Sequence, residues 1–366
     1  MIDGAVLSPW SQACLPPFDS LDFSISDGGE FDQVSRLGSI DESNDVTITM
    51  GTKTIYNPLD KRPNKLLCAT KAVKSIMKPF GTKATVLAAL VAILLSWRAQ
   101  RKKSLTPSGS LAAFAVGFLS IWTGARGWNL LIFYQLGTMA TKYKKDIKIK
   151  MDGSIATSGS QARGPAQVLA CSLVAVLLGL IHGVYCGEEG PIEFGTSNLA
   201  SCLTCGILAH HATCLADTLA SELGILSKSP PVLVTRPWKT VPSGTNGGVT
   251  PIGFFWSTLG GLIIGISTIV LDYLAGISPL NAMPLLVFTS TCGLLGSLID
   301  SLLGATIQQT YYDQDTKLVY QKDDDKPSSA NLVGGINMLT NEQVNVVSVA
   351  LTTAIGGWVL GPMFFI

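Results

Sequence analysis

The sequence has few charged residues and no excess of either sign. Only 14% of its 366 residues are charged, against about a quarter in ordinary soluble domains. Its 26 Lys and Arg nearly cancel its 25 Asp and Glu, leaving a formal net charge of +1. This balance excludes a basic surface for nucleic acid. Apolar residues make up 47% of the chain, and its mean hydropathy is +0.38. The composition predicts an integral membrane protein whose partner is the lipid bilayer.

The beginning of the chain lacks the early apolar run of a secretory signal, because the first such run is Ala84–Trp97. The preceding residues are polar, acidic up to Asp45 and basic from Lys53 onward. Such segments do not bury enough apolar surface to fold. We therefore predict that residues 1–76 are a disordered tail, or an extension upstream of a true start at Met77. Residues 77–366 are predicted to form a transmembrane helical domain.

Apolar segments recur from there to the end of the chain. The candidate spans are Lys83–Trp97, Ser108–Thr123, Gly127–Thr141, Pro165–Tyr185, Asn198–Leu219, Pro251–Tyr273, Met283–Leu303 and Val344–Pro362. The first three are short against the roughly 20 residues that cross a bilayer as a helix. The expected fold is all-α, a polytopic transmembrane helical bundle of six to eight spans.

Charge in the connecting loops gives the bundle a direction. If eight spans alternate, nearly all loop Lys and Arg fall on one side and Arg126 alone on the other. The loop Gly187–Ser197 carries three Glu and no cation. Since cytoplasmic loops carry the excess of Lys and Arg, we place the basic loops in the cytosol. The Lys-rich segment before the first span breaks this rule.

The eight cysteines do not form an extracellular disulfide framework. Six of them lie inside or beside apolar runs, which predicts reduced thiols. One group has metal-ligand spacing: Cys202, Cys205, His210, His211 and Cys214. All five lie in one span, and a helix scatters them around its circumference. Structural zinc sites draw ligands from separate elements, so the pattern argues against zinc.

Two acids stand at the end of the fifth span. At about 100° per residue, Asp217 and Ser221 share one stripe of the helix, whereas Glu222 is turned from Asp217 by roughly 140°. Acids at membrane depth are costly and tend to be functional. The two carboxylates would flank one cleft if the helix unwound near Gly224. The alternative is a helix end at the water interface, where an acid costs little.

The seventh span carries small residues and an acid on one face. Gly293, Ser297, Asp300 and Gly304 lie there between bulky aliphatic residues. Small residues at this spacing let two helices approach closely. Asp300 is not needed for packing, and we predict that it binds a cation or a hydrogen-bond donor. Gly260, Gly261 and Gly265 are likewise interpreted as packing residues.

A Gly-rich loop, Val241–Thr250, leads directly into the sixth span. Its backbone N–H groups and the helix N-terminus suit a phosphate or a carboxylate. The loop matches neither the Walker pattern nor the dinucleotide fingerprint, and Gly-rich turns between spans are common. The candidate phosphate-binding residues are Ser243, Gly244, Thr245, Asn246, Gly247 and Gly248.

With eight spans, these segments all face the cytosol, together with Ser104–Gly109, Gly159–Arg163 and Asn341–Asn345. This arrangement would hold acids for a divalent cation, Arg163 and the basic loops for phosphate, and aliphatic helices for a lipid tail. Phosphoryl transfer to a lipid fits these parts, because its catalysis is mostly positioning and charge neutralisation.

The motifs resemble the transmembrane protein 19 family. The resemblance rests on the segments Arg101–Gly109, Ala216–Glu222, Val241–Thr250, Gly293–Ala305 and Val344–Asn345. It implies a multi-span helical membrane protein, and some plant and cyanobacterial relatives look like phytyl-phosphate kinases that form an isoprenoid diphosphate. The family's site acids fall on Asp217, Glu222 and Asp300, and its asparagine on Asn345. Leu219 replaces the family's Trp, Cys171 replaces an Asn, and Thr340 replaces an Asp.

The resulting hypothesis is a kinase of a polyprenyl or phytyl monophosphate that uses Mg²⁺ and a nucleoside triphosphate. Asp217, Glu222 and Asp300 would be catalytic, with Mg²⁺ on Asp217 and Asp300. Phosphate would bind Arg163 and the Ser243–Gly248 loop, and Ser221, Asn341 and Asn345 complete the polar site. A transporter or lipid-handling protein is the alternative, in which the acids mark an ion path. The acidic N-terminus argues against a plastid transit peptide and favours the endoplasmic reticulum or another internal membrane.

Overall fold

The computed structural model describes residues 49–50, 53–54, 72–150, 162–195, 198–278, 282–321 and 326–365. The chain divides into two compact units, Met1–Arg62 and Pro63–Ile366. In the first unit, strand β1 (Thr49–Met50) pairs antiparallel with β2 (Lys53–Thr54). The predicted tail of residues 1–76 lies almost wholly outside the described residues, so its disorder and the start at Met77 stay predictions.

The second unit is a bundle of helices, as predicted. Each of the eight candidate spans is helical: α2 (Thr82–Arg101), α3 (Pro107–Trp122), α4 (Asn129–Lys142), α7 (Pro165–Ala170) with α8 (Leu173–Tyr185), α9 (Asn198–Gly224), α10 (Pro251–Ala275), α11 (Ala282–Ile307), and α12 (Asn341–Ile355) continued by η4 (Gly356–Leu360) and α13 (Gly361–Phe364). Five of these helical segments are long and apolar enough to cross a membrane, and α3 and α8 are shorter apolar helices. An all-α, multi-span membrane fold is therefore confirmed.

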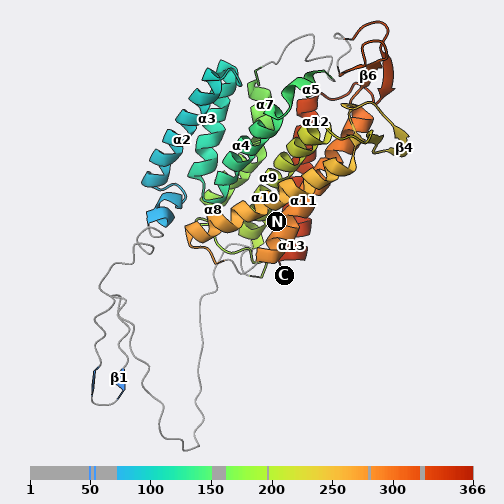
Figure 1. Cartoon of the computed structure of the whole chain (residues 1–366). Coiled ribbons are helices and arrows are strands. Elements are labelled where there is room, and N and C mark those ends of the chain that lie inside the picture. Colours follow the sequence, from blue (N-terminus) through green and yellow to red (C-terminus); the bar gives the residue numbers. More distant parts are fainter. Residues whose placement is uncertain are drawn as a thin grey trace, which may run out of the picture. The chain divides into compact units, whose positions relative to one another are not determined.

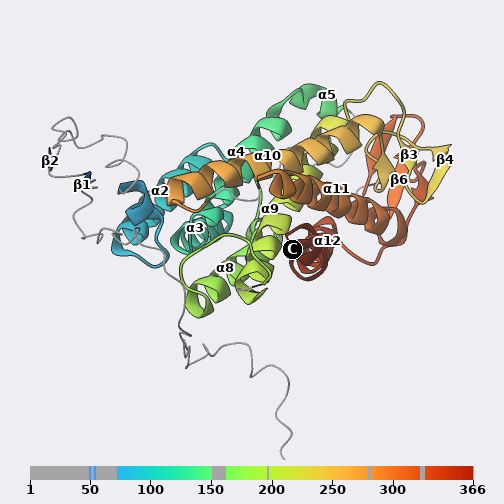
Figure 2. The same ribbon diagram turned by 90° about the horizontal axis from the view of Figure 1, so that it is seen from below.

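Helix α9 is the centre of the bundle. It packs against α4, α8, α10, α11 and α12, and Figure 2 shows it surrounded by them. In its most apolar window 83% of the residues are buried, against 28% in α2. The main apolar core lies along it, with Leu208, Leu215 and Phe288 fully enclosed. Side chains on α9 therefore face protein on most sides, whereas α2 presents Leu90, Trp97 and other large apolar residues outward.

Small residues bring α9, α10 and α11 close together. A Cβ atom on Gly260 would lie 2.6 Å from the Cα atom of Ala216, and one on Gly261 would lie 2.2 Å from the carbonyl oxygen of Thr289. A Cβ atom on Gly296 would meet the Thr213 side chain at 2.2 Å. These helices approach too closely for any larger residue at those positions, which confirms the packing role predicted for the glycines of α10 and α11.

Two connections at one end of the bundle fold into small antiparallel sheets. Strands β3 (Val232–Leu233), β4 (Arg236–Thr240) and β5 (Gly248–Val249) follow α9, and β6 (Thr310–Asp313), β7 (Leu318–Tyr320) and β8 (Asn331–Gly334) follow α11. Figure 1 shows β4, β6 and the short helix α5 (Lys145–Ile149) gathered at the same end. The sequence analysis did not predict these sheets, because their strands have only two to five residues.

A buried ion-pair cluster ties the other end of the bundle. Arg126, in the short helix η3 (Arg126–Trp128), is 1% exposed. Its guanidinium donates to both carboxylate oxygens of Asp272 on α10, at 3.0 and 2.9 Å, and to the Gly190 carbonyl oxygen at 2.9 Å. The Glu189 carboxylate accepts from the backbone N–H groups of Ala125 and Arg126. The lone cation predicted for this side thus joins two connections of the bundle to helix α10.

Candidate functional site

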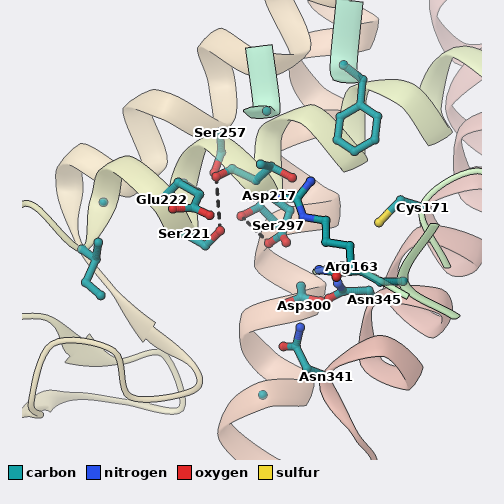
Figure 3. A pocket seen from close by; sticks show the side chains of 18 of the residues that line it. Arg163, Cys171, Asp217, Ser221, Glu222, Ser257, Ser297, Asp300, Asn341 and Asn345 are labelled. Carbon is teal, nitrogen blue, oxygen red and sulfur yellow. Dashed lines mark hydrogen bonds between the residues drawn. The ribbon is translucent and has the colours of Figure 1, made fainter. Parts of the chain in front are cut away.

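The predicted site residues line one cavity of about 480 Å³ at the end of the bundle that carries the sheets. They come from α9, α11, α12, the α9–α10 connection and Arg163, which lies two residues before α7. The cavity is lined by all thirteen: Arg163, Asp217, Ser221, Glu222, Ser243, Gly244, Thr245, Asn246, Gly247, Gly248, Asp300, Asn341 and Asn345. Segments far apart in the sequence therefore converge on one space, as the eight-span topology predicted. Figure 3 shows this polar end of the cavity from close by.

Asp217 and Asp300 lie on neighbouring helices, α9 and α11, and both turn toward the cavity (Figure 3). The Ser297 hydroxyl donates to Asp217 Oδ1 at 3.4 Å. Among the described residues neither carboxylate forms a salt bridge. Two acids on membrane-spanning helices that lack a cation partner among the described residues are candidates for binding a cation.

Asp300 is held by α12. The Ser348 hydroxyl donates to Asp300 Oδ1 at 3.0 Å. With its amide nitrogen turned inward, Asn345 donates to the same oxygen and to the Asn341 carbonyl oxygen, each at 3.2 Å. One carboxylate oxygen of Asp300 is thus fixed by two donors, while the other has no donor among the described residues. Ser348 is a positioning residue that the sequence analysis missed, although it lies three residues after Asn345 on the same helical face.

Glu222 lies in a different environment from the two aspartates. Its carboxylate accepts from Lys148 Nζ at 2.6 Å. Lys148, on α5, is 8% exposed and donates also to the carbonyl oxygens of Ala140 and Thr141, each at 2.9 Å. Helix α9 continues to Gly224, so the unwinding that was considered there does not occur. Glu222 lines the cavity as predicted, but Lys148 already neutralises its charge.

Arg163 is placed by the connection between α2 and α3. The Arg163 backbone forms an isolated β-bridge with Leu105. In this bridge, the Arg163 N–H donates to the Ser104 carbonyl oxygen at 3.0 Å, and the Thr106 N–H donates to the Arg163 carbonyl oxygen at 3.1 Å. A Cβ atom on Gly109 would lie 2.5 Å from that oxygen. The segment Ser104–Gly109 thus serves to hold Arg163. The Arg163 guanidinium donates to Thr141 Oγ1 at 3.0 Å and forms no ion pair within the described chain.

The Gly-rich loop forms one wall of the cavity. Gly247 has φ +72°, and a Cβ atom there would lie 2.4 Å from Ala305 Cβ and 2.6 Å from the Ser301 carbonyl oxygen. The backbone N–H groups of Thr245, Asn246 and Gly248 donate within the protein. Phosphate binding by this loop stays a prediction, and it rests on fewer free N–H groups than the sequence suggested.

The cavity offers oxygen donors of the kind that a divalent cation binds. No three His, Cys, Asp or Glu side chains in the described parts of the chain cluster as a ready metal site. Mg²⁺, however, is commonly held by one or two carboxylates together with substrate phosphates and water. The carboxylates of Asp217 and Asp300, with hydroxyl and amide groups around them, fit that mode.

The three departures from the family pattern have different consequences. Cys171 lines the cavity, and its carbonyl oxygen lies 3.1 Å from His210 Nε2. Leu219 is a core residue. Thr340 caps α12: its Oγ1 accepts from the Gln343 N–H, and its own N–H donates to Gln343 Oε1. Thr and Asp both serve as N-caps, so the replacement at position 340 preserves a helix start and removes no group that lines the cavity.

Comparisons with known proteins agree with the membrane fold. The chain is 33% identical over 275 residues to Protein PGR of Arabidopsis thaliana, a match that covers 73% of this chain and 93% of that protein. It is 31% identical over 214 residues to the uncharacterized membrane protein sll0875 of Synechocystis, covering 57% of this chain and 74% of the relative. A membrane protein of Methanocaldococcus jannaschii, MJ0933, is 26% identical over 225 residues, covering 60% and 82%. No solved structure matches the chain.

The family model described as integral membrane protein DUF92 matches residues 90–353. This region extends from α2 to α12 and contains every residue of the candidate site. The chain therefore belongs to the DUF92 family of integral membrane proteins.

Proposed function

We propose that this protein is a membrane-embedded kinase that transfers a phosphoryl group from a nucleoside triphosphate to a polyprenyl or phytyl monophosphate, with Mg²⁺. One observation carries the proposal: one cavity joins two carboxylates and a guanidinium, none of which forms an ion pair with any described residue, to a wall of apolar side chains. An isoprenoid monophosphate has the matching parts, an anionic head and a hydrocarbon tail.

The two aspartates would hold the cation. Asp300 has one oxygen fixed by Ser348 and Asn345 and one left for a ligand, and Asp217 faces it from α9. Mg²⁺ bound there would neutralise charge on the phosphate oxygens during transfer. Ser221, Ser297 and Asn341 offer neutral donors and acceptors around the same space.

Arg163 would bind the acceptor phosphate. A guanidinium that forms no ion pair with the described residues offers a planar pair of donors that matches phosphate oxygens, and Thr141 fixes its direction. In the reaction, an oxygen of the lipid monophosphate forms a bond to the γ-phosphorus while the bond to the β,γ-bridging oxygen breaks. The products are a lipid diphosphate and a nucleoside diphosphate.

The Lys148–Glu222 pair would close the neighbouring rim of the site. Lys148 reaches Glu222 and two carbonyl oxygens at the end of α4, and this fixes α5 against α9. The likeness of the motifs to the transmembrane protein 19 family supports the same function. We place the protein in the endoplasmic reticulum or another internal membrane, with the site on the cytosolic side, where nucleotide is available.

The test is a phosphotransfer assay on the purified full chain in detergent. The reaction contains Mg²⁺, labelled CTP or ATP, and a panel of isoprenoid monophosphates. Asp217→Asn and Asp300→Asn each remove one charge from the cavity, and Asp315→Asn makes the same change on the exposed β6–β7 turn as a control. We expect label in a lipid diphosphate with wild type and Asp315→Asn, and at least 100-fold less with the two site variants.

Two results of this assay would contradict the proposal. Transfer that survives both site substitutions would remove the aspartates from the mechanism. No transfer by folded protein with any donor and acceptor would refute the kinase. If isoprenoid monophosphate still bound in that case, the lipid-handling alternative would be favoured.

A further inference from the structure

The cavity extends beyond the polar site into an apolar arm between three helices. Its walls are residues of α2, α3 and α4, most of them apolar: Ala92, Leu95, Ala113, Val116, Gly117, Leu130, Leu131, Phe133, Tyr134 and Gly137. We propose that this arm is the binding site for the single hydrocarbon chain of the lipid monophosphate. The inference rests on the proposed function for the identity of the head group and adds where the tail lies.

The packing of the helices explains why the arm exists. Helix α2 packs extensively on α3 alone, while α3 and α4 touch only sparsely. The α2–α3 hairpin is anchored instead on α7 and α8 through α3. Small side chains at Ala92, Ala113 and Gly117 do not fill the remaining space; a Cβ atom on Gly117 would only just contact Ala92, at 3.7 Å.

The arm joins the polar site where α4 crosses α9. A Cβ atom on Gly137 would lie 3.4 Å from the Thr218 methyl group, and Thr218 follows Asp217 directly. The Thr141 hydroxyl that accepts from Arg163 donates to the Gly137 carbonyl oxygen at 2.9 Å. A phosphate on Arg163 therefore places the first carbons of its chain beside Gly137, at the mouth of the arm.

The geometry favours one chain of isoprenoid type over a two-chain phospholipid. The whole cavity of about 480 Å³ lies within the range of small-molecule pockets, about 300–1,000 Å³, and the polar site shares this volume with the arm. A diacyl lipid with the same phosphate head would have to leave one of its chains outside.

The test measures binding without nucleotide or Mg²⁺, so that it does not depend on phosphotransfer. The probe is a C20 isoprenyl monophosphate with a photoreactive group at the tail end, and labelled peptides are identified by mass spectrometry. Ala113→Phe fills the arm. Ala115→Phe makes the same change two residues away on the outward face of α3, where the side chain is exposed.

We expect wild type and Ala115→Phe to be labelled on the residues of α2, α3 and α4 that line the arm. In Ala113→Phe, this labelling should fall at least ten-fold. Isopentenyl monophosphate, which has almost no tail, should bind Ala113→Phe and Ala115→Phe alike. Phosphatidic acid should compete at least ten-fold more weakly than unlabelled C20 monophosphate.

Three results would overturn the proposal: label on the outer faces of α10 and α11 only, equal labelling of the two variants, or equal competition by phosphatidic acid. Arm-specific labelling by a protein that transfers no phosphate would keep the tail site and refute only the kinase.

Discussion

The two aspartates of the cavity differ in how firmly they are held. Asp300 receives donors from Ser348 at 3.0 Å and from Asn345 at 3.2 Å. Asp217 receives one long bond from Ser297 at 3.4 Å. Groups that orient a metal-binding carboxylate contribute to affinity without touching the metal. In the proposed Mg²⁺ site, Asp300 would therefore be the pre-oriented ligand, and Asp217 the one whose position adjusts to what enters the cavity.

Ser348→Ala tests this difference. Loss of its donor frees the Asp300 carboxylate to rotate, and we expect the Mg²⁺ concentration for half-maximal phosphotransfer to rise about 10- to 100-fold while the fold is kept. Thr291→Ala is the control, because the Thr291 hydroxyl bonds only to the Val287 carbonyl oxygen on its own helix. An unchanged Mg²⁺ requirement in Ser348→Ala would show that Asp300 is not a metal ligand that Ser348 orients.

At the scale of elements, the α9–α10 connection is fixed to α11 through Gly247. This position combines a positive φ with contact against Ala305 and the Ser301 carbonyl oxygen. Gly187 offers a comparison, since it has φ +77° with open space around the missing Cβ atom. Alanine at either site is strained by its backbone, but only at position 247 does it also collide with another element.

We predict that Gly187→Ala destabilises the protein by about 1–2 kcal/mol, and that Gly247→Ala costs about 1–3 kcal/mol more through overpacking. Thermal unfolding in detergent measures both. The cavity wall should also move away from α11 in Gly247→Ala, so that Cys171 reacts faster with a small thiol reagent. Equal destabilisation of the two variants would show that the loop does not depend on this close approach.

The Arg126 cluster acts between elements at the opposite end. Breaking a buried pair by removing one partner leaves an uncompensated charge and costs about 3–5 kcal/mol, whereas replacing both partners by apolar residues is far less harmful. We expect Arg126→Met to lose stability in that range, and Arg126→Met with Asp272→Leu to recover at least half of the loss. The unfolding midpoints of wild type and of the two variants measure these losses. If the double variant is no more stable than Arg126→Met, packing rather than charge determines stability at this cluster.

For the whole molecule, the sequence predicted the eight helical segments and the residues that share the cavity. It did so because lipid imposes long apolar runs and because acids within such runs are rare. It missed Ser348, Lys148 and the apolar arm. A single serine such as Ser348 carries no sequence signal. The ion pair between Lys148 and Glu222 joins residues 74 positions apart, and a sequence does not show such long-range contacts. The arm depends on the sparse contact of α3 with α4, which is a property of the folded chain.

The sidedness of the molecule is the prediction that belongs to this scale. The described parts of the basic loops lie at the end of the bundle that carries the sheets, and residues 187–195, which follow α8, lie at the other end (Figure 1). The polar site residues of the cavity belong to the end with the sheets. Gln314→Cys, on the exposed β6–β7 turn, should react with a membrane-impermeant maleimide from the cytosolic side of sealed vesicles. Gly195→Cys, with open space around it, should react only from the other side, with wild type as the background. Labelling of both from one side would refute the eight-span topology.

The enclosure of α9 also constrains how the protein is made. A chain is synthesised from its N-terminus, so α9 enters the bilayer before α10, α11 and α12 exist to cover it. Until then, His210, His211 and Asp217 lack much of the protein that later surrounds them, and polar groups at membrane depth are costly. We therefore expect α4 and α8, which pack against α9 and are made before it or with it, to cover part of it during synthesis. The polar end of the cavity is completed only when α12 arrives with Asn341 and Asn345, so a ribosome that stops before residue 341 leaves a protein without its site.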